Sequence, residues 1–253
     1  MNTYTPRQRA LALLYGLACH AAFAAAVAAM MWKLHHGLQG GPTLPLPLAI
    51  AWDAVLVLQF PLLHSLLLTP AGGRTLRKLV PGGIGDELRT TTFALLASLQ
   101  LLLAFTAWAP LGPVWMELRG PLRSLSTLLY AGAWLLLAVS MADAGLGVQT
   151  GGLGWWAVFR DRRPVYPAWR ERGTLRATRH PMYLAYTLIL WTGPVWSPDH
   201  LVLAVLWTSY CLLAPLHKES RYRRRHGEPF RAYQKRVPYF LPRFKRIPKP
   251  TDA

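Results

Sequence analysis

The stretch Arg179-His180-Pro181-Met182-Tyr183 opens an apolar run that extends to residue 196 and follows a strongly basic segment, residues 160–179. Pro181 has a fixed φ and no backbone N–H, so it suits the first turn of a helix. The free N–H groups at such a helix start favour anions. The stretch therefore predicts a helix with a basic, polar mouth, although a helix that simply begins at a snorkelling basic anchor would have the same sequence.

The composition around this stretch indicates a membrane protein. The chain is 53% hydrophobic, with 11 Trp and 28 Lys+Arg against 11 Asp+Glu. A soluble nucleic-acid-binding protein could share this charge but not the long apolar runs, so we expect no nucleic-acid partner. Six runs approach the length needed to cross a hydrocarbon core of roughly 30 Å. They are residues 9–32, 47–68, 90–111, 122–143, 182–196 and 200–216.

The sequence thus predicts an all-α, polytopic membrane protein of about six transmembrane helices, the last two forming a hairpin. Of the 28 Lys and Arg, only Lys33, Arg119 and Arg123 lie outside the N-terminal segment, the second and fourth loops and the tail. Because basic residues concentrate on the cytoplasmic side, we expect both termini and the His180 loop to be cytoplasmic. In a bacterium this would be the inner membrane. The basic tail would form a cytoplasmic C-terminal cap.

Polar residues inside the apolar runs are candidates for function. Ionisable groups within a span are costly and usually face a cavity or a partner. Asp53 and His64 share a face of the second span, about 16 Å apart along its axis. His64 therefore either faces a cavity or serves as a structural histidine that bonds a neighbouring helix. Trp108 and Trp115 fit an aromatic belt on the outer side.

Two further segments frame the opening stretch. Residues 145–154, which follow Asp143 and include Gln149, contain five glycines and allow close approach of backbone or ligand. Beyond the hairpin, residues 218–226 and 230–236 are predicted to be helical, with a stop at Gly227. The arginines of this tail would attract anionic lipid at the cytoplasmic face. Its apolar residues would fold back as one face: Phe230, Tyr233, Val237, Phe240 and Leu241.

These residues together resemble a known family. Gly173-Thr-Leu-Arg-Ala-Thr-Arg179-His180-Pro181-Met182-Tyr183 resembles the G-x-Y/L-R-x-x-R-H-P-x-Y signature of integral-membrane methyltransferases. That group includes the isoprenylcysteine carboxyl methyltransferases and the phospholipid methyltransferases. Their tail motif, which follows a similar hairpin, is matched at Glu219, Gly227, Phe230, Tyr233, Val237, Pro238 and Pro242. The likeness covers roughly residues 143–243. Lys218 stands in place of the first glutamate of the tail motif, and Phe230 stands in place of its first tyrosine.

The N-terminal half is similar to one branch, the methanethiol S-methyltransferases and the denitrification-associated membrane proteins near them. His64-Ser65 at the end of the second span, Leu88-Arg89-Thr90 and Asp143 with Gln149 carry this likeness. The resemblance implies two parts: residues 1–145, transmembrane helices 1–4, and residues 146–253, a catalytic region. The catalytic region would contain the interfacial loop, the opening stretch, the hairpin and the basic cap.

The resemblance implies S-adenosylmethionine as the cofactor and a methyl transfer in line from its sulfonium to the acceptor. The cofactor would be held by Gln149, Leu175, Arg179, His180, Pro181, Met182, Tyr183, Glu219 and Tyr233. Arg179 and His180 suit its carboxylate, and the tyrosine faces suit its sulfonium. His64 and Asp143 are the candidate catalytic residues. No HExxH or CxxC pattern occurs, so no metal is expected.

The acceptor implied is a small thiol or a lipophilic molecule that enters from the bilayer. A thiol ordinarily ionises with a pKa of about 8.5, so His64 could act as its base. An isoprenylcysteine carboxylate is already ionised and would leave His64 structural. A phospholipid amine is a third acceptor, and a non-catalytic membrane protein of the denitrification-associated type is the alternative to an enzyme.

Overall fold

The computed structural model describes residues 3–242, and the remaining residues of the two predicted parts, 1–2 and 243–253, lie outside this range. Six helices occupy the predicted apolar runs: α1 (Pro6–His35), α2 (Leu46–Leu67), α4 (Arg89–Thr106), α5 (Gly120–Asp143), α8 (Pro181–Trp191) and α9 (Pro198–His226). Shorter elements lie between and after them: α3 (Pro70–Lys78), β1 (Met116–Glu117), α6 (Leu146–Gln149), α7 (Gly152–Phe159), η1 (Gly173–Arg176), β2 (Val195–Trp196) and α10 (Glu228–Arg236).

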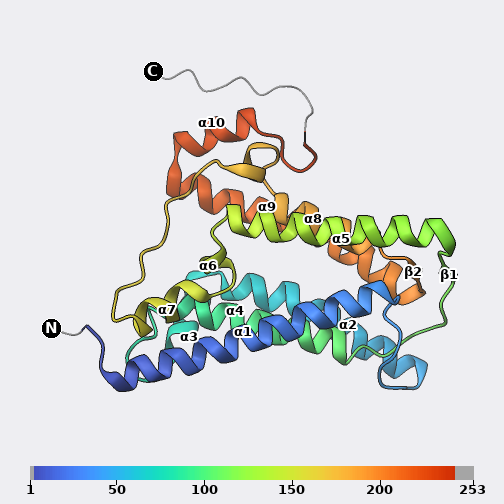
Figure 1. The fold of residues 1–253 in the computed structure, drawn as a ribbon, viewed down its shortest axis with the longest axis horizontal. Helices are drawn as coiled ribbons and strands as arrows, with labels where there is room; N and C mark the ends of the chain where they lie inside the picture. Colours follow the sequence, from blue (N-terminus) through green and yellow to red (C-terminus); the bar gives the residue numbers. More distant parts are fainter. Residues whose placement is uncertain (1–2, 243–253) are drawn as a thin grey trace.

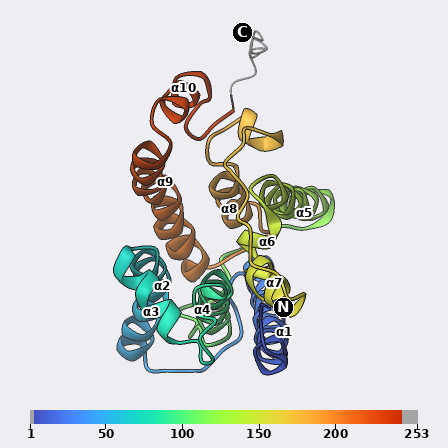
Figure 2. The same cartoon turned by 90° about the vertical axis from the view of Figure 1, so that its left-hand side faces the viewer.

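The helices form two layers (Figures 1 and 2). One layer contains α1, α2, α3, α4 and α7, and the other contains α5, α8 and α9, with α10 folded against the end of α9. The short helix α6 lies between the layers and contacts both α5 and α7. A single large apolar cluster joins the layers. Its buried members include Met30, Phe105, Tyr130, Ile189 and Leu203. Both halves of the sequence therefore share one core.

Five helices are long and apolar enough to cross a membrane: α1, α2, α4, α5 and α9. Their outer faces carry exposed leucines such as Leu62 (64%), Leu128 (69%) and Leu213 (61%), which suits contact with lipid. The sixth, α8, has 11 residues. At about 1.5 Å per residue it covers about 16 Å, roughly half of a hydrocarbon core. The predicted all-α membrane fold is confirmed, with α8 shorter than the predicted run.

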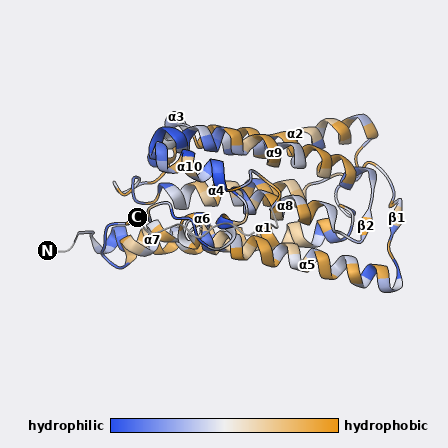
Figure 3. Cartoon of the chain, turned by 90° about the horizontal axis from the view of Figure 1, so that it is seen from above, coloured by the Kyte–Doolittle hydropathy of each residue, from blue (hydrophilic) through white to orange (hydrophobic). Residues whose placement is uncertain are grey.

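Polar residues gather at one end of the molecule. Figure 3 shows the hydrophilic ribbons of α3, α10 and the last turns of α9 at the end opposite the strands β1 and β2. The strands pair antiparallel, Met116 with Trp196 and Glu117 with Val195. The basic loops and the tail, which were predicted to share one side of the membrane, thus lie at a common end.

At the strand end, two buried acids bind the chain that follows α4. Asp53 Oδ1 accepts the Ala109 N–H at 3.0 Å, and Asp199 Oδ1 accepts the Trp108 indole N–H at 2.9 Å. The predicted place of Trp108 in an exposed aromatic belt is therefore wrong, because its N–H is satisfied inside the protein and it is 2% exposed. Trp115 is 59% exposed, as expected of a belt residue.

Candidate functional site

The polar end contains a buried carboxylate, Glu219 of α9, which is 4% exposed. His180 Nε2 lies 2.9 Å from Glu219 Oε1, and Arg179 Nε lies 2.8 Å from the same oxygen. Gln234 of α10 donates its amide to Oε2 at 2.5 Å. Glu219 therefore ties together the start of α8, the end of α9 and the cap. We call Arg179, His180, Glu219 and Gln234 the Glu219 cluster.

His180 is the N-cap residue of α8, and Pro181 occupies the first helical position, as the opening stretch predicted. Burial lowers the pKa of His180, and the hydrogen bond to Glu219 opposes this effect. A neutral ring that donates through Nε2 leaves Nδ1 as an acceptor, a tautomer inferred from the hydrogen bonds. Within residues 3–242 this buried Nδ1 has no hydrogen-bond partner, so it is available to a ligand donor.

Arg179 is fixed by the cap. Its Nη1 donates to the carbonyls of Gln234 at 2.6 Å and Val237 at 3.2 Å, and its Cζ lies 5.4 Å from the ring centroid of Tyr239. Its backbone N–H donates to Pro238 O at 3.0 Å. The sequence suggested that Arg179 and His180 face a ligand carboxylate. In the structure both face Glu219, so a ligand anion would share Arg179 with this residue.

A second set of predicted residues joins η1 to the cap and to α5. The Thr174 N–H and hydroxyl donate to Asp143 Oδ2 at 2.7 and 2.8 Å. The next residue, Leu175, accepts the Tyr233 hydroxyl on its carbonyl at 2.7 Å. Gly173 begins this turn with φ +50°, and a Cβ there would lie 2.2 Å from Asp143 Oδ2. Asp143 thus shapes the turn that positions Leu175 and Tyr233.

The aromatic faces of the site are partly occupied. The Tyr233 ring packs edge-on against Trp169, with centroids 4.9 Å apart, and Tyr233 is 1% exposed. Tyr183 lies edge-on to His180 at 5.9 Å and has Lys218 Nζ 5.9 Å from its centroid. Of the two tyrosines expected to face a sulfonium, Tyr183 lies edge-on against His180 of the Glu219 cluster, whereas the Tyr233 ring packs against Trp169.

The predicted apolar face of the tail is confirmed for three of its five residues, and Phe240, which is half-buried, is not part of the cluster within residues 3–242. Phe230, Tyr233 and Val237 form a buried cluster with Trp169 and Tyr222. Leu241 is 70% exposed, so its predicted place in this face is wrong. The cap therefore closes over the end of α9 by ordinary apolar packing as well as by the contacts of Glu219.

Three predicted site residues stand apart from the Glu219 cluster. His64 lies between Phe60 and Phe93, at centroid distances of 5.0 and 4.7 Å, and its buried Nδ1 has no partner within residues 3–242. Gln149 is exposed at the end of α6. Met182 packs against the large apolar cluster. In the described part of the chain, no hydrogen bond links any of these side chains to Glu219.

Sequence reasoning missed Gln234, Thr178 and Tyr239. The Thr178 hydroxyl donates to Phe240 O at 2.7 Å, and the Tyr239 ring lies 4.9 Å from His180. Each of these residues lies next to a motif residue in the chain, and this adjacency was the one feature of the sequence that could have identified them. Their partners are distant in sequence, however, and no local pattern identifies them.

Comparison with known proteins agrees with this architecture. No family model matches the chain, and no solved structure matches it. A methanethiol S-methyltransferase of Pseudomonas deceptionensis is 29% identical over 220 residues, 85% of this chain and 81% of the relative. A Bradyrhizobium diazoefficiens enzyme of that name is 28% identical, over 85% of this chain and 84% of its own.

A third relative, a methanethiol S-methyltransferase of Mycobacterium tuberculosis, is 26% identical over 78% of this chain and 80% of its own length. These matches extend well beyond the segment that contains the opening stretch and the tail motif. These matches, and the five helices of the described residues that are able to cross a membrane, agree with the resemblance that the sequence motifs indicate. Over most of its length the chain is therefore similar to proteins named methanethiol S-methyltransferase, in agreement with its resemblance to the integral-membrane methyltransferases.

Proposed function

We propose that the protein transfers a methyl group from S-adenosylmethionine to a small thiol, and that methanethiol is the acceptor to test first. The name of the relatives supports the thiol. The structural observation that carries the proposal is the Glu219 cluster. It is a buried carboxylate with fixed polar neighbours at the polar end of a membrane protein, next to His180 Nδ1, an acceptor that has no partner within residues 3–242.

The reaction needs a nucleophile, a donor and a route for one proton. In the proposed reaction the acceptor sulfur would attack the methyl carbon, and the carbon–sulfur bond of the sulfonium would break with its electron pair remaining on the donor sulfur. The thiol proton leaves to a base or to water, so methanethiol yields dimethyl sulfide, the demethylated donor and a proton. Alignment of the partners and exclusion of water supply most of such catalysis, without a covalent protein intermediate.

The residues present fit a donor with an amino group, a carboxylate and a sulfonium. Glu219 would accept hydrogen bonds from the amino or ribose groups, and the free Nδ1 of His180 would accept another. Arg179 would share its charge between Glu219 and the donor carboxylate. The Tyr183 ring would face the sulfonium as it would any cation. Gln149, Leu175, Pro181, Met182 and Tyr233 complete the proposed binding set.

His64 is our proposed base for the thiol. Its Nδ1 is buried and unpaired within residues 3–242, and the aromatic rings on either side would exclude water from a small apolar acceptor. In this proposal Asp143 acts indirectly, through the turn at Thr174, because the Thr174 N–H and hydroxyl both donate to its carboxylate. It would hold the turn at Leu175 rather than touch the reacting atoms.

The decisive experiment measures dimethyl sulfide by gas chromatography. Protein purified in detergent would receive S-adenosylmethionine with methanethiol, with a prenylated cysteine or with phosphatidylethanolamine. We expect product from methanethiol and its loss in Glu219→Gln and His180→Gln. Glu228→Gln is the matched control, since Glu228 is exposed on α10. Calorimetry without donor binding from micromolar to millimolar, with no product from any acceptor, would favour a non-catalytic protein of the denitrification-associated type.

The proposed base has its own test. His64→Ala should lower turnover most at low pH, where the thiol is least ionised, and less as pH approaches the thiol pKa of about 8.5. Unchanged turnover of methanethiol by His64→Ala across pH 6 to 9 would remove His64 from the reaction.

We also propose that the polar end, with both termini and the cap, faces the cytoplasm and contacts anionic lipid there. Cysteines introduced at the exposed positions Lys78 and Arg119 would show by their labelling which side of the membrane each end faces. The native Cys19 and Cys211 are buried and should not react with the label. Labelling of Lys78→Cys and Arg119→Cys from the same side of intact cells would contradict this orientation.

A further inference from the structure

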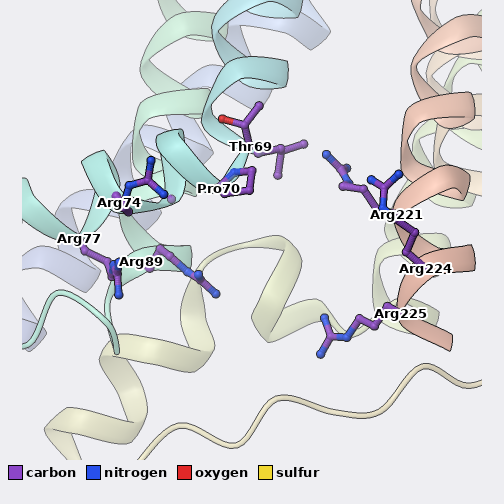
Figure 4. Close-up of a pocket in the computed structure, with 10 residues that line it drawn as sticks. Thr69, Pro70, Arg74, Arg77, Arg89, Arg221, Arg224 and Arg225 are labelled. Atoms are coloured by element: carbon purple, nitrogen blue, oxygen red, sulfur yellow. The ribbon is translucent and has the colours of Figure 1, made fainter.

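A cavity of about 670 Å³ opens at the polar end between the two layers. Six arginines line it: Arg74, Arg77, Arg89, Arg221, Arg224 and Arg225. Figure 4 shows three of them on the α3 and α4 side and three on α9, with the two sets facing each other across the gap. We call these residues the arginine cavity.

Within residues 3–242, most of this charge has no acidic partner. Arg77 pairs with Asp86 at 3.0 Å, and Arg224 donates to the Ser220 hydroxyl at 2.9 Å. Within residues 3–242, the guanidinium groups of Arg74, Arg89, Arg221 and Arg225 make no ion pair. Guanidinium stays protonated at any physiological pH, so these groups repel one another across the cavity. An anion of several charges would relieve that repulsion.

The cavity is distinct from the Glu219 cluster although α9 carries both. Residues two positions apart on a helix point about 200° apart, so Glu219 and Arg221 face opposite ways. Glu219 faces the cap, and Arg221 faces α3. The proposed methyl donor carries a single carboxylate, which we assign to Arg179, and its sulfonium and amino group are positive. Methanethiol has no anionic group besides its thiolate. Neither ligand of the proposed reaction suits six arginines.

Guanidinium groups recognise phosphate with paired, charge-assisted hydrogen bonds. The surroundings point to a particular phosphate. On the membrane side of the arginines, α2 exposes Leu62, Leu63 and Leu66, and α9 exposes Leu213 and Leu216, by 45 to 64%. Two helices therefore present leucines and then arginines in the order in which a phospholipid presents its acyl chains and its headgroup.

We propose that the arginine cavity is a specific binding site for the phosphate headgroup of an anionic phospholipid. The lipid chains lie against the exposed leucines of α2 and α9. The headgroup bridges α3 and α4 to α9, the helix that carries Glu219. Lipid composition then affects how firmly the two layers are held together at the polar end.

The test uses full-length protein, delipidated in a neutral detergent, and titrated with three probes. These are dioctanoyl phosphatidylglycerol, dioctanoyl phosphatidylcholine and inorganic pyrophosphate. Binding is followed by microscale thermophoresis. The pocket variants are Arg74→Gln/Arg221→Gln and, independently, Arg89→Gln/Arg225→Gln. The control Arg162→Gln/Arg170→Gln removes the same charge from exposed residues of the loop after α7.

Each lost charged hydrogen bond weakens binding by about tenfold or more, so we expect at least that loss of phosphatidylglycerol affinity in both pocket variants. The control should change it by less than about twofold, since dispersed surface charges contribute little. Phosphatidylcholine should not saturate the site. If the first pocket variant does not fold, the second decides.

Two results would overturn the proposal. Equal weakening in the pocket variants and the control would mean diffuse attraction by the whole basic surface. Pyrophosphate that binds as tightly as phosphatidylglycerol and displaces it would identify a soluble phosphate compound as the occupant. Both outcomes are independent of methyl transfer, because no reaction is measured.

Discussion

Replacement of Glu219 by glutamine removes one buried negative charge while keeping the shape of the side chain. In the structure one carboxylate oxygen faces His180 Nε2 and forms an ion pair with Arg179, and the other accepts the Gln234 amide N–H. A glutamine amide has a single oxygen, so one side of it must place a donor against a donor. Arg179, whose side chain is 13% exposed, loses its acid partner at the same time.

The size of the effect follows from these contacts. Breaking a buried ion pair costs about 3–5 kcal/mol, and a hydrogen bond to a charged group contributes about 1.5–3 kcal/mol. In the variant, Arg179 still donates to two backbone carbonyls and still lies over the Tyr239 ring. The loss of stability should therefore lie near the lower end of the range for a broken ion pair. We expect the free energy of unfolding to fall by about 3 kcal/mol, or the melting temperature by about 6–12 °C for a chain of this size.

Thermal scans of tryptophan fluorescence in detergent at pH 7.5 measure this shift. Glu228→Gln is the control, because the same chemical change at a side chain that is 71% exposed should cost under about 0.5 kcal/mol. Equal melting temperatures for Glu219→Gln and Glu228→Gln would refute the reasoning, because the carboxylate would then not hold the start of α8 and the cap together.

Three other changes test the surrounding site by the same scans. Gly173→Ala should lower the free energy of unfolding by about 1–3 kcal/mol more than Gly120→Ala does. Both glycines have a positive φ, but of the two only Gly173 has a side-chain oxygen, Asp143 Oδ2, 2.2 Å from the added Cβ. Equal losses of stability would exclude the Asp143 contact. Tyr233→Phe should cost about 1–3 kcal/mol by leaving the buried Leu175 carbonyl unsatisfied, whereas a neutral result would mean that water replaces the hydroxyl. Because burial lowers the pKa of His180, stability should fall as pH drops below the unfolded value of about 6.5, and His180→Gln should flatten that fall between pH 7 and 5.5; parallel curves would show that His180 does not titrate on unfolding.

The positions of the long helices were predictable because each is a nearly unbroken apolar run. Two of the predicted ends were wrong for local reasons. The run after Tyr183 continues to residue 196, but α8 ends at Trp191, where Gly193-Pro194 disfavours helix. The third span was predicted to reach residue 111, but α4 ends at Thr106, because the following backbone bonds to Asp53 and Asp199.

The candidate site, too, was only partly predictable from the sequence. Motif spacing grouped Arg179, His180 and Glu219, which lie in contact in the structure, since short segments on either side of a hairpin must meet at its open end. It did not show that Glu219 neutralises Arg179, because a pairing between distant segments depends on how the cap folds. The arginine cavity could not be predicted from the sequence for the same reason. Its two sets of arginines are far apart in the chain, and either set alone has the composition of any basic loop.

The unbroken course of α9 restricts how this chain can change in length. From Pro198 to His226 one helix passes from the buried Asp199 at the strand end, through the core, to Glu219 and Arg221 at the polar end. Deleting a single residue within it would rotate everything beyond by about 100° and draw it back by about 1.5 Å, so the Glu219 cluster and the arginine cavity would be lost together. Residues 162–172, by contrast, contain no helix or strand and are mostly exposed. Insertions and deletions that leave both sites intact should therefore accumulate in that loop and be absent between Asp199 and Arg225.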